Sequence, residues 1–255
     1  MITVSTLNEV SRVRHAFFTR SGGSSEGVYA GLNCGFGSGD DPVRVASNRA
    51  VAMARLEQGP NALVTVRQEH TNTVLVVDKP FPHDQAPVAD ALVTKRVNLV
   101  LGVLTADCAP VLLADGRGRV VAAVHAGWRG ALAGVVDAAI VAMEGLGAKR
   151  ARIVAAIGPS ISRRSYEVGP EFPAPFLTED ADNAEFFRES PRAGRYLFDL
   201  PGYLARRLAR IGVSDVATTP CDTCIEADRF YSYRRSVMAG DAAYGRQLSA
   251  IVLEP

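Results

Sequence analysis

Short apolar runs, separated by glycine, proline and polar turn residues, recur along the chain and predict a mixed β-sheet. Many of these runs are rich in valine, isoleucine and threonine, whose branched side chains favour strands. The predicted strands cover residues 13–19, 62–66, 73–77, 91–94, 98–105, 111–114, 120–125, 153–157 and 248–253.

Three other segments have apolar residues at helical spacing. Asp41 and Pro42 have the residue types of an N-cap and a first helical position, and the helix that they begin should bury Ala46, Ala50 and Met53. The clearest helix covers residues 130–147, with inward positions at Leu132, Val136, Ile140, Met143 and Leu146. A third begins near Asp199 and turns inward Leu204, Leu208 and Ile211.

No internal repeat and no linker-like composition divides the chain. Residues 172–192 are polar and interrupted by proline, which predicts a surface excursion. We therefore predict one α/β or α+β domain over residues 1–255, with a mixed β-sheet flanked by helices.

Composition narrows the class of protein. Of 255 residues, 47% are apolar and 22% charged, and the net charge is only +1. The apolar content excludes a disordered chain. The balance of charges argues against nucleic-acid binding, which needs a surplus of clustered Lys and Arg, and favours a small-molecule substrate. Four cysteines are too few for a disulfide scaffold.

The N-terminal segment has no signal-peptide pattern, because residues 1–14 lack a continuous apolar region and carry charges early. The longest apolar stretch, residues 97–106, is too short to cross a bilayer. We therefore expect a cytoplasmic protein with reduced cysteines and no membrane partner, present as a monomer or a small homo-oligomer.

The unusual polar residues stand where predicted strands end. His70 lies in a turn between two predicted strands, Cys108 lies between two others, and His125 is the last residue of a strand that precedes the clearest helix. Two imidazoles and a thiolate are suitable ligands for zinc or copper, and three such ligands leave a position open for a water of lowered pKa.

The spacing alone does not choose this interpretation. The 37 residues between His70 and Cys108, and the 16 between Cys108 and His125, match no local zinc motif. Each histidine can instead be a hydrogen-bonded structural residue, and Cys108 a small buried apolar one. A third reading makes Cys108 a nucleophile with His125 or His70 as its base.

Other candidate features have common structural explanations. The segment Gly127-Trp128-Arg129-Gly130 places amides and a guanidinium at a helix start, where an anion can bind, and Arg20 can contribute from another strand end. Either arginine can instead form an ordinary ion pair. Cys221 and Cys224 form a lone C-x-x-C, which can be half of a metal site, a redox pair or two packed thiols. We favour the structural interpretation over a regulatory disulfide.

Several blocks together are highly specific. They are Phe18-Thr19-Arg20-Ser21-Gly22-Gly23, Gly31-Leu32-Asn33, Gln68-Glu69-His70, residues 105–110 and 125–130, Ile157-Gly158-Pro159 and residues 232–235. In these blocks, through nearly the whole chain, the sequence resembles the YfiH-like laccase-domain family. That family is also described as polyphenol oxidase-like, as a peptidoglycan-editing factor and as a purine nucleoside phosphorylase.

The resemblance implies that His70, Cys108 and His125 bind one zinc, or copper in some accounts, and form the catalytic centre. It implies phosphorolysis of adenosine, inosine, guanosine and methylthioadenosine, and deamination of adenosine, so that the partners are a nucleoside and phosphate. Arg20, Asn33, Asp107 and Arg129 are the candidate substrate or phosphate contacts.

Two alternative activities remain open at this stage, together with a non-enzymatic metal-binding partner. A copper-dependent polyphenol oxidase is also ascribed to the family, although a multicopper site needs several centres and this chain has only four histidines. A cysteine hydrolase that edits peptidoglycan precursors would use the same three residues.

Overall fold

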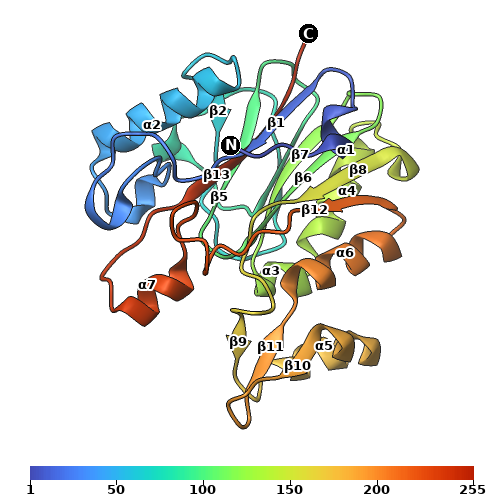
Figure 1. Cartoon of the computed structure of the whole chain (residues 1–255). Coiled ribbons are helices and arrows are strands. Elements are labelled where there is room, and N and C mark those ends of the chain that lie inside the picture. Colours follow the sequence, from blue (N-terminus) through green and yellow to red (C-terminus); the bar gives the residue numbers. More distant parts are fainter.

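Two large β-sheets lie face to face at the centre of the molecule, and helices cover their outer faces (Figure 1). The computed structural model describes all 255 residues. The four-stranded sheet has the order β1 (Val13–Phe17), β13 (Gln247–Leu253), β5 (Val100–Thr105) and β2 (Leu63–Val64). The six-stranded sheet has the order β12 (Asp215–Thr218), β8 (Ile153–Ile157), β6 (Ala109–Asp115), β7 (Val121–Ala126), β4 (Ala91–Thr94) and β3 (Val74–Val76).

Both large sheets are mixed. In the six-stranded sheet β6 pairs antiparallel with β7 and β8, whereas the pairs β3–β4 and β12–β8 are parallel. The helices are α1 (Ser5–Asn8), α2 (Pro42–Arg55), α3 (Trp128–Leu132), α4 (Val135–Gly145), α5 (Pro173–Glu179), α6 (Leu200–Arg210) and α7 (Tyr233–Ala239). None of them is long and apolar enough to cross a membrane.

Alternating side chains of each central strand enter different parts of the core. On β6, Val111 and Leu113 pack beneath α4 and α6, whereas Leu112 and Ala114 face the four-stranded sheet. On β13, Ile251 faces the six-stranded sheet, and its neighbours pack with residues of α2. Strands buried on both faces appear in the sequence as continuous apolar runs. The predicted single α/β fold with a mixed sheet flanked by helices is confirmed.

Two helix predictions need correction. The segment 130–147 forms two helices, because Gly134 between α3 and α4 has a φ of +85°, which breaks the helix. On α2 the prediction of a helix is right, but Ala46 is exposed. Met53 is buried as predicted, and the rest of the buried face consists of Val45, Asn48 and Ala52.

The segment 172–192 lies apart from the two large sheets, as a surface excursion would, but it forms regular secondary structure. It contributes α5 and β10 (Phe187–Glu189), and β10 pairs with β11 (Tyr196–Phe198) and β11 with β9 (Glu167–Val168) in a small sheet that projects from the body of the molecule (Figure 1). Phe176 and Phe198 are fully buried there, with ring centroids 4.9 Å apart. Aromatic packing orders this segment although its sequence is polar.

His15 couples the stability of the fold to pH. It lies buried on β1, and its Nε2 accepts a hydrogen bond of 3.0 Å from the amide of Val4. Burial lowers the pKa of His15 from 6.5 to about 4. The unfolded chain therefore binds the proton more readily, so the stabilisation is complete above pH 6.5 and is lost as the pH falls toward 4.

We predict that the substitution His15→Gln, which keeps an acceptor near Val4 but does not titrate, flattens the acid side of the stability profile. Between neutral pH and pH 4, the wild type should lose up to about 3 kcal/mol more of its free energy of unfolding than the variant. Urea unfolding across this range measures the difference. Parallel profiles for the two proteins would show that His15 is not the titrating group.

Candidate metal centre

His70 lies in a tight turn that a buried carboxylate organises. The turn is in the connection from β2 to β3, and His70 has a φ of +61°, in the left-handed region that few non-glycine residues adopt. The amides of Glu69, His70 and Thr71 donate to the carboxylate of Asp90 over 3.2, 3.0 and 2.6 Å. These three bonds fix the turn and offset the cost of its backbone conformation.

Asp90 also orients the second histidine. It is fully buried directly before β4, and its Oδ1 lies 2.8 Å from Nδ1 of His125 on β7. Burial raises the pKa of Asp90, but the hydrogen bonds from His125 and from the Thr71 amide outweigh it and lower the pKa to about 2. Because Asp90 is ionised and accepts from Nδ1, Nε2 of His125 is left to bind a metal.

Cys108 stands at the junction between strands of the two large sheets. β5 of the four-stranded sheet ends at Thr105, and β6 of the six-stranded sheet begins at Ala109. Between them Asp107 has a φ of +86°, and its carboxylate accepts from Oγ1 of Thr223 over 2.7 Å and from the amide of Arg234 over 2.6 Å. These bonds hold the chain in the conformation that turns Cys108 toward the histidines.

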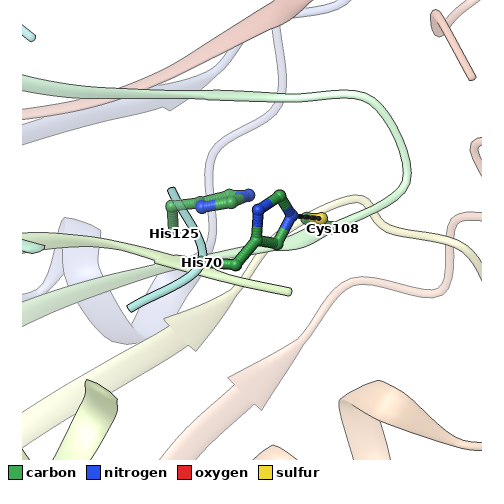
Figure 2. A group of neighbouring side chains, drawn as sticks. All are labelled: His70, Cys108 and His125. Atoms are coloured by element: carbon green, nitrogen blue, oxygen red, sulfur yellow. Dashed lines mark hydrogen bonds between the residues drawn. The ribbon is translucent and has the colours of Figure 1, made fainter. Parts of the chain in front are cut away.

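The three side chains meet although they are far apart in the sequence (Figure 2). Sγ of Cys108 lies 3.5 Å from Nε2 of His70, and the ligand atoms of all three residues lie within 4.8 Å of one another. Burial opposes ionisation of the thiol, but His125 and His70 outweigh it and lower the pKa of Cys108. Against burial, the thiolate and Asp90 raise the pKa of His125. This donor set and spacing fit a tetrahedral zinc or a copper ion.

Two residues that support the centre were missed in the sequence analysis. Asp90 stands among apolar residues at the start of a buried strand, and such a lone carboxylate is the signal that was available. Gly127 approaches the ligands so closely that a Cβ there would collide with the His70 ring and lie 3.0 Å from Sγ of Cys108. In the sequence, its place at a helix start indicates anion binding instead.

The ligand cluster opens into a cavity of about 990 Å³, a volume suited to a small-molecule ligand. Its aromatic lining residues are Phe36, Trp128, Tyr166, Phe172, Tyr233 and Tyr244. Six arginines also line it, namely Arg49, Arg67, Arg129, Arg195, Arg234 and Arg246. Only three acidic residues oppose them, which are Asp84, Asp107 and Glu167. The cavity therefore offers flat apolar surfaces and an excess of positive charge.

The other candidate residues divide between the cavity and the scaffold. Asp107 and Arg129 line the cavity, and the Arg129 guanidinium lies 4.6 Å from the Trp128 ring centroid. Arg20 does not line it, because its guanidinium donates to the carbonyls of Ala30 and Ala227. Asn33 is fully buried and also lies outside the lining.

The C-x-x-C pair lies outside the cavity lining. Cys221 and Cys224 are both free and partly buried, and burial raises the pKa of each thiol. Thr223, between them, is the residue that donates to Asp107. This segment is therefore connected to the Cys108 junction through a hydrogen bond and not through its sulfur atoms.

Comparison with known proteins places the chain among characterised families. A family model described as multi-copper polyphenol oxidoreductase laccase matches residues 14–254. A protein of Streptomyces coelicolor named purine nucleoside phosphorylase is 43% identical over 235 residues, which cover 92% of this chain and 95% of that protein. One of Corynebacterium glutamicum with the same name is 41% identical over 232 residues, covering 91% and 92% of the two chains.

A solved structure agrees with this relationship along the same length. The crystal structure of the Bacillus licheniformis hypothetical protein YfiH has a TM-score of 0.88 to this chain at 28% identity, and the match covers 95% of this chain and 93% of that one. The resemblance found in the sequence blocks is thereby confirmed: the chain belongs to the YfiH-like laccase-domain family.

Proposed function

We propose that this chain is a zinc-dependent purine nucleoside phosphorylase that also deaminates adenosine. The observation that carries the proposal is the His70–Cys108–His125 cluster, open to a cavity with aromatic and cationic walls. The relatives named purine nucleoside phosphorylase support this activity. Adenosine, inosine, guanosine and methylthioadenosine are the proposed substrates for phosphorolysis.

The chain's own residues fit a single metal ion. One thiolate and two imidazoles are typical ligands of an open zinc site, and Asp90 orients His125 as carboxylates orient many zinc-binding histidines. Copper accepts the same ligands, so the donor set favours both metals over magnesium or calcium. When bound there, zinc supplies Lewis-acid chemistry.

The cavity walls are suited to a nucleoside and a phosphate. Aromatic faces such as those of Trp128 and Tyr166 can stack on a purine, and guanidinium groups bind phosphate oxygens in pairs.

In phosphorolysis a phosphate oxygen bonds to ribose C1′ while the bond from C1′ to the purine nitrogen breaks. The products are ribose 1-phosphate and the free purine, which retains the bonding electrons and takes up a proton. Asp107, which lines the cavity, is the proposed proton carrier.

A copper-dependent polyphenol oxidase is less well supported, although the matching family model has that description. Oxidation of phenols with four-electron reduction of oxygen needs several copper ions with many ligands. Among the groups of His, Cys, Asp and Glu that could hold a metal, the structure contains one cluster of three residues.

Cys108 supports a second candidate function, a cysteine hydrolase that acts on peptidoglycan precursors. Sγ of Cys108 lies beside Nε2 of His70, and the histidines lower the pKa of the thiol as a nucleophile requires. Chelation separates the two candidates. Removing the metal should abolish phosphorolysis and leave a cysteine hydrolase active, whereas alkylation of Cys108 should stop either enzyme.

We predict that the purified protein binds about one zinc or copper ion per chain and that Cys108→Ser and His125→Ala each lose it. Inosine phosphorolysis should fall by at least about a hundredfold in both variants. Elemental analysis and a purine-release assay measure the two effects. Cys221→Ser is the matched control and should keep both metal and activity. Full activity in either triad variant would refute the assignment.

We predict that Asp90→Asn weakens metal binding by about 10- to 100-fold, because an amide cannot replace the charged acceptor of His125 Nδ1–H. Competition with a chromogenic chelator measures the affinity. Asp115→Asn is the control, since Asp115 is equally buried on β6 but pairs with Arg152 away from the cluster. Equal affinities in the two variants would contradict the role given to Asp90.

We predict that Gly127→Ala lowers metal affinity by at least about tenfold while the protein still folds, since the new Cβ must displace His70 or Cys108. The control is Gly145→Ala near the end of α4, where a Cβ meets no atom within 4 Å. Chelator competition and thermal unfolding separate the two effects. A Gly127→Ala variant with unchanged metal affinity would show that the close approach has no role in the site.

A further inference from the structure

Five of the six arginines that line the cavity form no salt bridge with a carboxylate. Arg49 and Arg246 both line the cavity, and neither forms a salt bridge in the structure. Arg67, on the same cavity, is different, because its Nε lies 3.0 Å from a carboxylate oxygen of Glu69. Arg129 and Arg195 are exposed to solvent, and Arg234 donates to the carbonyl of Glu167. Arg49 and Arg246 are partly buried, and a partly buried charge loses hydration that a partner normally replaces.

Arg49, on α2, is fixed in place by uncharged groups. Its Nε donates to the carbonyl of Cys34 over 2.8 Å, and its Nη1 donates to Oγ1 of Thr65 over 3.2 Å. The guanidinium lies 4.5 Å from the ring centroid of Phe36. Burial lowers the pKa of Arg49 to about 10, as expected for a cation that no carboxylate stabilises. Its Nη2 has no hydrogen-bond partner within the protein.

Arg246 approaches the same part of the wall from the start of β13. Its backbone amide donates to Oδ1 of Asn33 over 2.9 Å, and the same oxygen accepts from the amide of Gly35. The Arg246 side chain packs against Gly35, where a Cβ would lie 3.2 Å from Cδ of the arginine. Its Nη1 is buried and has no hydrogen-bond partner. A buried guanidinium nitrogen without an acceptor indicates that an acceptor is supplied from outside the chain.

The loop formed by residues 34–36 joins the two arginines. Cys34 and Phe36 contact Arg49, and Gly35 contacts Arg246. Thr65 adds a third group, because its Oγ1 accepts from Arg49 and its hydroxyl hydrogen remains available to another acceptor. Two cations and a hydroxyl donor on one wall match a tetrahedral oxyanion, whose several oxygens can accept from all of them.

We propose that Arg49, Arg246 and Thr65 form the binding subsite for inorganic phosphate, the second substrate of this enzyme. The assignment rests on the proposed function for the identity of the anion, whereas the unpaired arginines stand independently of it. Phosphate bound in this subsite supplies the attacking oxygen. That oxygen forms a bond to ribose C1′ as the bond from C1′ to the purine breaks, while the two guanidinium groups stabilise the negative charge of the phosphate. Arg20, which is occupied by carbonyl groups, is not part of this subsite.

The test measures phosphate binding directly, by isothermal titration of inorganic phosphate into the purified protein at constant ionic strength set with chloride. The wild type should bind phosphate, and Arg49→Gln and Arg246→Gln should each weaken binding by at least about tenfold. Arg44→Gln removes the same charge from a position of α2 that lies outside the cavity lining and pairs with Glu26, and it should bind phosphate like the wild type. Unchanged binding in both cavity variants would overturn the subsite.

Steady-state kinetics supplies a second readout and keeps the two proposals distinguishable. If the subsite is right, Arg246→Lys, the milder change, should raise KM for phosphate severalfold and leave KM for inosine unchanged. If phosphate binds in an Arg246-dependent manner but inosine is not cleaved, the proposed activity fails and the subsite stands. If inosine is cleaved with an unchanged KM for phosphate in all three variants of Arg49 and Arg246, the subsite fails and the activity stands.

A further binding experiment, with inosine 5′-monophosphate, distinguishes free phosphate from the phosphoryl group of a nucleotide. This nucleotide has a tetrahedral phosphate group on the 5′ carbon of its ribose. Free phosphate as the occupant predicts that this nucleotide binds no more tightly than inosine and that its affinity does not depend on Arg246. Tighter binding that Arg246→Gln abolishes would overturn the assignment to free phosphate.

Discussion

The hydrogen bonds to the buried carboxylate of Asp90 are the interaction on which the rest of the site depends. One carboxylate accepts from three consecutive amides of the His70 turn and from the ring of His125. It thereby joins the connection between the two sheets to a strand of the six-stranded sheet. Without this acceptor, His70 would have no support for its left-handed backbone, and the free nitrogen of His125 would have no fixed direction.

The sandwich of sheets brings the third candidate ligand, Cys108, to this pair. Its strands are buried on both faces, so that polar residues gather where the chain leaves one sheet for the other. Cys108 lies at such a junction, and Asp107 and Gly127 supply the backbone conformation and the space that allow its thiol to reach the histidines. The site is thus assembled from strand ends, and the aromatic and arginine side chains that line the cavity come from segments around it.

The sequence predicted the fold class and the strands of the two large sheets except β12, because a strand buried on both faces is a continuous apolar run. β12 is a partly exposed edge strand without such a run, and the three short strands of the small sheet were not predicted either. The sequence did not predict the regular structure of residues 172–192, because packing between distant aromatic side chains orders that segment. It also did not predict the break at Gly134, because the apolar spacing of the predicted helix continues through this residue. The turns in which they lie indicated the three candidate ligands, and the family resemblance selected them. Asp90 and Arg246 could not be found in this way, since a buried carboxylate or an unpaired guanidinium is recognised only from its neighbours in space.

The most direct measurement is X-ray absorption spectroscopy of the protein as purified, at the edge of whichever metal elemental analysis finds. The account predicts one site per chain, with two imidazole nitrogens and one thiolate sulfur in the first coordination sphere and a remaining light-atom ligand from solvent. A metal without a sulfur ligand, or one bound by two sulfur atoms, would contradict the assignment of His70, Cys108 and His125.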